Sequence, residues 1–524
     1  MLEGATVVLW EVDAVPPAAI AGSRADENPV FLIVVTTAGD WVVYGPTGAS
    51  VGEGSVINGV GFVELSLALA WQKEMVPGTD VVVGRVREEY GIVAKLRRTG
   101  RVSEHIKKAA LERDHDLRAV RETVERIIED VRERGEEAVR EHSARLDDWD
   151  PPSFRMSEDE IAQAEARVSE TIKEDVRFAV AQVENFARLQ RERLVDFENE
   201  TLPGVWLGQK HIPVASVGSY TPGGRYPLIA SAIMTIVTPR IAGVERIVAA
   251  SPPRNAAGIH PPSVYAMTAS GVTDVYCVGG VQALAAFAFG AIEGLEPVDM
   301  IVGAGNAFVA EAKRQLFGTV GIDLLAGPTE ILIIADESAD PEVVAADLLG
   351  QAEHDPRSPA VLVTTSEVLG RRVLELVDKL LESWPTADVA GPAWRDNGEI
   401  IVAADPEEAV RLADGFAPEH LEVQTSDPAW YAQRLRNYGS LFLGEESTVV
   451  YSDKAMGTNH VLPTMRAARY TGGLWVGKFL KTVTTQRLSR EGSVAVAGPA
   501  GRIAGAETMF GHEITANMRI ERYS

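Results

Sequence analysis

The chain has 524 residues, 46% hydrophobic and 24% charged, which predicts a folded protein with more than one domain. Its formal net charge of −25 argues against nucleic acid and anionic membrane surfaces as partners, because both attract basic proteins. No apolar stretch approaches the roughly 20 residues that span a bilayer, and no secretory signal is visible, so we expect a cytoplasmic protein. The single cysteine, Cys277, lies in an apolar run and is expected to be a buried structural thiol.

Residues 1–92 are expected to form a separate small α+β unit. Two β-rich runs, 31–37 and 41–45, flank a short loop that contains Gly39, which predicts a hairpin. A helix is expected near 64–73. The role of this extension stays open between a lid, an oligomerisation unit and a fused domain without effect on the chemistry.

Charged helical sequence follows from about 93 to 200. One apolar face is predicted from helical spacing, and Gly135 is expected to close that helix; the face consists of Val120, Val124, Ile127, Ile128 and Val131.

From 212 to 365 the pattern changes to short apolar runs separated by helical stretches. The runs are 246–250, 274–278, 300–302, 331–335 and 360–364. Strands that are apolar on both faces and alternate with helices predict parallel sheets and an α/β fold. Gly and Pro cluster at the strand ends, and the carboxyl ends of such strands are the usual ligand sites.

A partial dinucleotide motif lies within this region. Gly303 and Gly305 follow an apolar run, but Phe308 stands where the third glycine belongs. By itself this pattern indicates either a nucleotide site or only a tight turn.

Four of the nine histidines stand near carboxylates or amides. They are His354 with Gln351, His420 with Glu419, His460 with Asp453, and His512 with Glu507. In a helix, Gln351 and His354 would share one face and could share a metal. Each pair alone could be a surface or hydrogen-bonded histidine, whereas the four together suggest a dispersed metal and acid–base site.

Several strings of the sequence resemble histidinol dehydrogenases. They occur in family order across about 93–524, at 220–224, 279–283, 325–330, 351–356 (Gln-Ala-Glu-His-Asp-Pro), 417–422 (Ala-Pro-Glu-His-Leu-Glu) and 457–464 (Gly-Thr-Asn-His-Val-Leu-Pro-Thr). The resemblance implies an α/β fold with two Rossmann-like doubly wound domains. The expected boundaries are 1–92 for the extension, 93–219 with 329–474 for the first Rossmann-like domain with its helical N-terminal part, 220–328 for the second, NAD-binding domain, and 475–524 for a helical tail swapped in a dimer.

The resemblance also implies particular roles. Zinc would be held by Gln351, His354, Asp453 and His512 of the partner subunit, which implies a homodimer with shared active sites. His420 would be the catalytic base, with Glu419 assisting water activation, and together they would oxidise an alcohol through the aldehyde to the carboxylate with NAD. Substrate contacts are expected from Thr329, His460 and Glu507, and NAD contacts from Tyr220, Gln282 and Asn306.

The sequence leaves more than one substrate open. Several strings, including Gly-Gly-Arg-Tyr-Pro at 223–227, look closer to the branch that oxidises 2,3-dihydroxypropane-1-sulfonate (sulfopropanediol), and Thr329 stands where histidinol oxidisers usually carry Ser. Arg225 could bind the sulfonate or could be a surface arginine. Histidinol and another small hydroxy compound stay open as substrates, and a metallohydrolase or a non-enzymatic scaffold are remoter alternatives.

Overall fold

The computed structural model describes residues 7–12, 31–36, 40–44, 50–55, 103–110, 118–224, 226–254 and 257–524. The chain divides into two compact units, Met1–Gly100 and Arg101–Ser524. No described helix is both long enough and apolar enough to cross a membrane.

The first unit contains a four-stranded sheet in the order β1-β2-β3-β4. Its strands are β1 (Val7–Val12), β2 (Phe31–Thr36), β3 (Asp40–Tyr44) and β4 (Ser50–Ser55). β2 and β3 pair antiparallel, which confirms the expected hairpin, whereas β1 pairs parallel with β2. The helix expected near 64–73 lies outside the described residues.

The second unit contains a five-stranded parallel sheet in the order β10-β9-β8-β11-β12. The strands are β8 (Ser216–Tyr220), β9 (Arg246–Ser251), β10 (Val275–Cys277), β11 (Met300–Val302) and β12 (Gly321–Ile322). The chain starts in the middle, runs to one edge and then returns to the other side, which is a doubly wound arrangement. Cys277 is buried as expected, and burial raises the pKa of its thiol to about 12.

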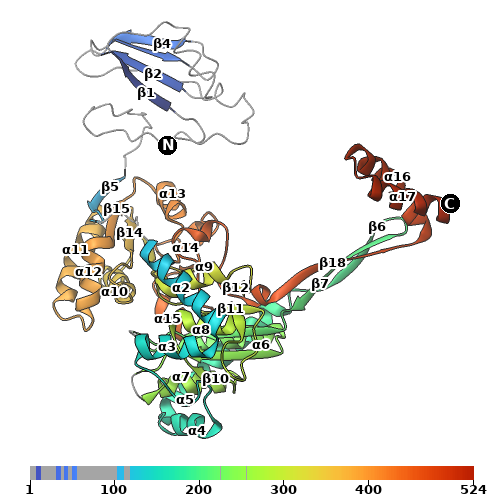
Figure 1. Ribbon diagram of the computed structural model, residues 1–524. Coiled ribbons are helices and arrows are strands. Elements are labelled where there is room, and N and C mark those ends of the chain that lie inside the picture. The colour runs from blue at the N-terminus through green and yellow to red at the C-terminus, as the bar shows by residue number, and fades with distance from the viewer. Residues whose placement is uncertain are drawn as a thin grey trace. The chain divides into compact units, whose positions relative to one another are not determined.

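Helices cover both faces of this sheet (Figure 1). One face packs against α2 (Arg118–Arg134), α3 (Glu136–Asp147), α8 (Gly280–Phe289) and α9 (Ala307–Leu316). The other packs against α4 (Glu158–Ala166), α5 (Glu170–Arg191), α6 (Ile229–Ala242) and α7 (Pro261–Ala269).

The N-terminal helices pack differently from the domain division expected from sequence. The apolar face of α2 is buried and Gly135 has a φ of 61°, as the sequence predicts. However, α2 to α5 pack on the five-stranded sheet rather than on the sheet formed by 329–474. An amphipathic pattern shows that a helix has a buried face, but it does not specify which sheet covers that face.

The other large sheet has six strands in the order β17-β16-β13-β14-β15-β5. Five are parallel and only the edge strand β5 is antiparallel; the strands are β5 (Glu104–Lys107), β13 (Ile331–Ala335), β14 (Ala360–Thr364), β15 (Gly398–Val402), β16 (His420–Gln424) and β17 (Ser440–Leu443). One face is covered by α10 (Pro341–Ala352), α11 (Glu367–Leu381) and α12 (Ala387–Asn397), the other by α13 (Pro406–Phe416) and α14 (Pro428–Ala432). The five parallel strands are arranged in the same chain order as those of the five-stranded sheet. This arrangement confirms a Rossmann-like α/β fold.

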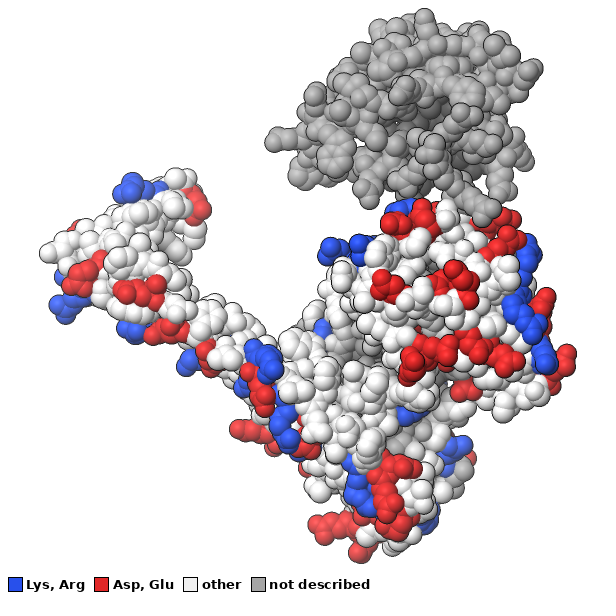
Figure 2. Space-filling view, turned by 180° about the vertical axis from the view of Figure 1, so that it is seen from behind, with Lys and Arg blue, Asp and Glu red and all other residues white. Residues whose placement is uncertain are grey.

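An extended arm leaves the second unit (Figures 1 and 2). It consists of an antiparallel sheet of β6 (Phe197–Leu202), β7 (Val205–Pro213) and β18 (Leu480–Leu488), followed by α16 (Arg490–Ala506) and α17 (Phe510–Tyr523). None of the residues of α17 is buried. Large apolar side chains are therefore exposed on the arm helices, among them Ile503, Phe510, Ile514 and Met518.

Candidate active site

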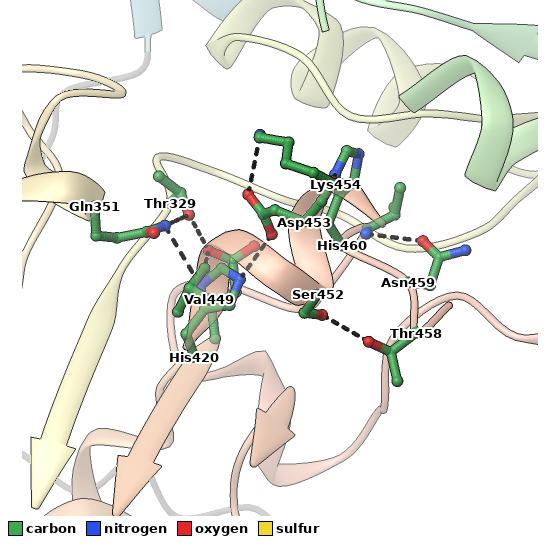
Figure 3. Close-up of polar contacts among 12 residues, drawn as sticks. Thr329, Gln351, His420, Val449, Ser452, Asp453, Lys454, Thr458, Asn459 and His460 are labelled. Carbon is green, nitrogen blue, oxygen red and sulfur yellow. Dashed lines mark hydrogen bonds and ion pairs between the residues drawn. The ribbon is translucent and has the colours of Figure 1, made fainter. Parts of the chain in front are cut away.

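The candidate catalytic residues gather where strands of the six-stranded sheet begin. His420 is the first residue of β16, and Glu419 immediately precedes it. Gln351 lies in the last turn of α10 and His354 just beyond its end, and Asp453 lies in the short helix α15 (Val449–Lys454). The general expectation of a site at the carboxyl ends of parallel strands therefore fails for this sheet. Figure 3 shows how Gln351, His420 and Asp453 converge.

The two ring nitrogens of His420 face different groups. Nδ1 donates to the backbone carbonyl of Glu330 at 3.0 Å, because a carbonyl oxygen can only accept. Nε2 is buried without a hydrogen-bond partner among the described residues and lies 3.7 Å from Asp453 Oδ1, itself also without such a partner. Burial would lower the pKa of His420, but the charges of Glu419 and Asp453 outweigh it and raise the pKa to about 9. One imidazole nitrogen is thus available to a substrate or ligand.

Glu419 is held by a chain of hydrogen bonds. Its carboxylate accepts from the Thr329 hydroxyl and, at 3.0 Å, from the backbone N–H of Glu330. The Thr329 hydroxyl in turn accepts from the side-chain nitrogen of Gln351. Burial raises the pKa of Glu419 to about 7, although the charge of His420 and the two hydrogen bonds oppose this. A carboxyl group with a pKa near neutrality is suited to exchange protons with water.

Thr329 therefore contacts two other predicted site residues, Glu419 and Gln351. The sequence predicted a substrate contact at this position, and the structure adds a direct link between Glu419 and Gln351. Because the Gln351 nitrogen is committed to Thr329, the amide oxygen is the atom left for a metal.

The residues expected to bind zinc come together only in part. α10 ends at Ala352, so His354 lies in the turn beyond the helix rather than on a helical face shared with Gln351. Its backbone N–H still donates to the Gln351 carbonyl at 3.3 Å. His512 and Glu507 are exposed at the end of the arm, and the described residues contain no group of three His, Cys, Asp or Glu side chains placed to hold a metal. One chain thus does not bring His512 to Asp453.

Three side chains of one chain nevertheless fit a zinc ion by their chemistry. Imidazoles and carboxylates are ordinary zinc ligands, and the neutral amide oxygen of Gln351 can add a further oxygen donor. Asp453 Oδ1 is buried and unpartnered, and burial lowers the pKa of His354, which favours the neutral imidazole that a metal needs. The carboxyl end of α10 also favours a cation through the helix dipole.

His460 lies beside Asp453 with both ring nitrogens in use. Nδ1 donates to the Asp453 backbone carbonyl at 3.1 Å, and Nε2 lies 2.8 Å from the hydroxyl of Ser231. Burial lowers the pKa of His460, although the charge of Asp453 opposes this. In this arrangement His460 orients Asp453, and its expected substrate contact stays a prediction. Sequence analysis missed Ser231, which no motif distinguishes.

Glu422, two residues after His420 on β16, forms a second pair of carboxyl groups with Asp347 of α10. Glu422 and Gln424 follow His420 on the same face of β16, because side chains alternate along a strand. The Gln424 side-chain nitrogen donates at 3.0 Å to both Glu422 and Asp347 of α10. Glu422 also accepts from the backbone N–H of Val449, the first residue of α15, at 3.2 Å. The pair therefore ties together the elements that carry His420, Gln351 and Asp453.

The residues expected to contact NAD lie at the carboxyl ends of strands in the five-stranded sheet. The Tyr220 hydroxyl accepts from the backbone N–H of Gly280 at 3.0 Å, and Gln282 donates to Asp147 at 3.0 Å. The Asn306 side chain caps α9 by accepting from the backbone N–H groups of residues 308 and 309. All three shape this end of the sheet, and direct NAD contacts stay a prediction.

A buried ion pair supports the loop between β11 and α9. Lys313 and Asp323 form it with side chains 2% and 0% exposed. Lys313 also donates to the Gly303 carbonyl at 2.8 Å, and the Gly303 N–H donates to Asp323 at 2.9 Å. Gly303 has a φ of 135°, and a Cβ there would collide with the Tyr220 carbonyl, so only glycine fits.

A family model described as histidinol dehydrogenase matches residues 111–520. The chain belongs to the histidinol dehydrogenase family. A histidinol dehydrogenase homolog from Shouchella clausii is 52% identical over 77% of this chain and 95% of its own length. The sulfopropanediol 3-dehydrogenase of Ruegeria pomeroyi is 49% identical over 80% of this chain and 97% of its own. The histidinol dehydrogenase of Gluconobacter oxydans is 40% identical over 78% of this chain and 95% of its own.

A solved structure confirms the fold assignment. The crystal structure of histidinol dehydrogenase from Elizabethkingia anophelis has a TM-score of 0.74 and 32% identity, covering 79% of this chain and 94% of that one. Members of the histidinol dehydrogenase family are NAD-dependent oxidoreductases that act on CH–OH groups, and this chain is an enzyme of that class. The first unit, Met1–Gly100, lies outside the family match.

Proposed function

We propose that this enzyme oxidises the primary alcohol of a small anionic diol, such as sulfopropanediol, through the aldehyde to the carboxylate. The observation that carries the proposal is the unpartnered Nε2 of His420, fixed by the Nδ1 hydrogen bond to Glu330 and facing Asp453. Alcohol oxidation requires a base for the hydroxyl proton, and a neutral imidazole nitrogen is suited to accept it. Bound NAD would accept the hydride.

Gln351, His354 and Asp453 would hold zinc together with His512 of the partner subunit. When bound, zinc would orient the substrate's oxygen atoms and offset the charge of Asp453 that raises the pKa of His420. The His420 imidazole would then be neutral at a lower pH. This is the protonation state in which His420 accepts a proton.

Glu419 would act in the second oxidation. Converting the aldehyde to a carboxylate requires that water adds to the carbonyl carbon. Glu419 is adjacent to His420 and oriented by Thr329, so it could accept a proton from that water. Both steps would then use one buried cluster of side chains.

A homodimer would complete each site. His512 and Glu507 lie on the arm, away from Asp453 of their own chain. The arm helices expose several large apolar side chains, and such surfaces commonly mark protein interfaces. Docking of the arm on a second copy would cover this surface and could deliver both residues to the other site.

The anionic diol is favoured over histidinol by the similarity to the sulfopropanediol 3-dehydrogenase of Ruegeria pomeroyi at 49% identity. Histidinol is the second candidate, because a histidinol dehydrogenase shares 40% identity over a similar length. Arg225, which the sequence suggested as the sulfonate ligand, lies outside the described residues.

The deciding experiment follows NADH formation by the purified full-length enzyme with sulfopropanediol, glycerol and histidinol. We expect the highest kcat/KM with sulfopropanediol. Turnover of histidinol without turnover of any diol would refute the substrate proposal. Hydrolysis of an ester panel without NAD reduction by any alcohol would instead support a metallohydrolase.

A further inference from the structure

Lys454 is a cation of the site that the sequence motifs did not single out. It is the last residue of α15, directly after Asp453, and its side chain is 49% exposed. Its ammonium lies 3.6 Å from Asp453 Oδ2, whereas His420 Nε2 lies 3.7 Å from Asp453 Oδ1. The catalytic imidazole and the ammonium thus flank opposite oxygens of one carboxylate (Figure 3).

The charge of Lys454 affects the pKa of two other histidines of the site, His354 and His460. Burial lowers the pKa of both His354 and His460; the charge of Asp453 opposes this, and the smaller effect of the Lys454 charge acts in the same direction as burial. Among the described residues, Asp453 is the one ionic partner of the Lys454 ammonium. The Lys454 ammonium is therefore part of the electrostatic environment in which a substrate would bind.

We propose that Lys454 binds the anionic tail of the substrate and thereby determines the preference for a sulfonate or carboxylate. This inference rests on the proposed alcohol oxidation at His420. A three-carbon diol with its hydroxyl at His420 would extend its tail toward Lys454, because both groups contact the same Asp453 carboxylate. A cationic substrate such as histidinol would be repelled at this position.

The proposed zinc ligation strengthens the argument. If Asp453 shares its carboxylate with a zinc ion, the attraction between that carboxylate and the Lys454 ammonium weakens. A half-exposed ammonium in this situation gains from a new anionic partner, and charge-assisted hydrogen bonds to sulfonates or carboxylates are strong. The alternative to a substrate-binding role is a structural one, in which Lys454 only stabilises the carboxyl end of α15 through the helix dipole.

The test compares Lys454→Met with a control at Lys379, a lysine in the last turn of α11. We expect Lys454→Met to lower kcat/KM for sulfopropanediol about 10–150-fold, and for uncharged glycerol far less. Lys454→Arg should retain most of the preference, and Lys379→Met should change neither substrate. Equal losses on both substrates would assign Lys454 to the structure of α15 and overturn the proposal.

A binding measurement separates this inference from the proposed reaction. Calorimetric titration with sulfolactate, the anionic product, needs no turnover and uses the zinc-loaded full-length enzyme. We expect Lys454→Met to weaken sulfolactate binding about 10-fold or more, and zinc content to stay unchanged. Unchanged sulfolactate affinity would refute the role of Lys454, whereas weakened affinity with no diol oxidation by the wild type would refute only the reaction. If Arg225→Ala alone abolishes binding of the anion, Lys454 is not its ligand.

Discussion

Replacing Lys313 by Met removes one partner of the buried ion pair beneath the loop between β11 and α9. The Lys313 and Asp323 side chains are 2% and 0% exposed, so water cannot compensate for the missing charge. Removing one partner of a buried pair typically costs about 3–5 kcal/mol, because the other charge stays buried without compensation. Asp323 keeps its hydrogen bonds from the Gly303 and Leu324 N–H groups, which places the expected loss near the lower figure.

The assay is urea unfolding of the wild type and variants at equal protein concentration. Arg371→Met serves as the control, because the ion pair of Arg371 with Glu367 is exposed and should be worth about 0.5 kcal/mol or less. The double variant Lys313→Met with Asp323→Leu should recover part of the loss, since no buried charge remains. A loss below about 1 kcal/mol for Lys313→Met would show that the pair is solvated or replaceable, and the reasoning would be wrong.

Further predictions concern the site. His420→Asn should lower kcat about 10²–10⁴-fold with nearly unchanged substrate binding, and a loss within about threefold would mean that another residue takes the proton. His354→Ala should lose zinc in metal analysis, and full occupancy would contradict its role as a ligand. Burial raises the pKa of Glu422 from 4.5 to about 8, so the folded protein retains a proton that the unfolded chain releases between these values. Stability should therefore fall as pH rises through this window, and Glu422→Gln should reduce the fall in urea midpoint between about pH 5 and about pH 9. Hybrid dimers of a His420→Asn chain and a His512→Ala chain should keep one intact site and about half of the wild-type activity if the arm crosses to the partner; inactive hybrids with both chains folded would contradict sharing.

The sequence by itself determines the local structure and the chemistry-bearing residue types. Apolar runs separated by helical stretches predict β9, β10, β11, β13 and β14, and all five are parallel strands in the structure. The apolar stripe of α2 and the hairpin of β2 and β3 follow from local periodicity in the same way. The motif strings also identify the family, which its model and relatives confirm.

Only the tertiary structure decides which distant residues meet. The packing of α2 to α5 on the five-stranded sheet, and the position of the site at the amino end of β16, depend on contacts between segments far apart in sequence. The Asp347 and Glu422 pair has no local pattern, because the two residues lie on different elements. Lys454 directly follows Asp453 in the sequence, but only the structure shows that Lys454 and His420 lie at opposite oxygens of that carboxylate. Periodicity records which face of a segment is buried, whereas side-chain packing between segments selects its neighbours.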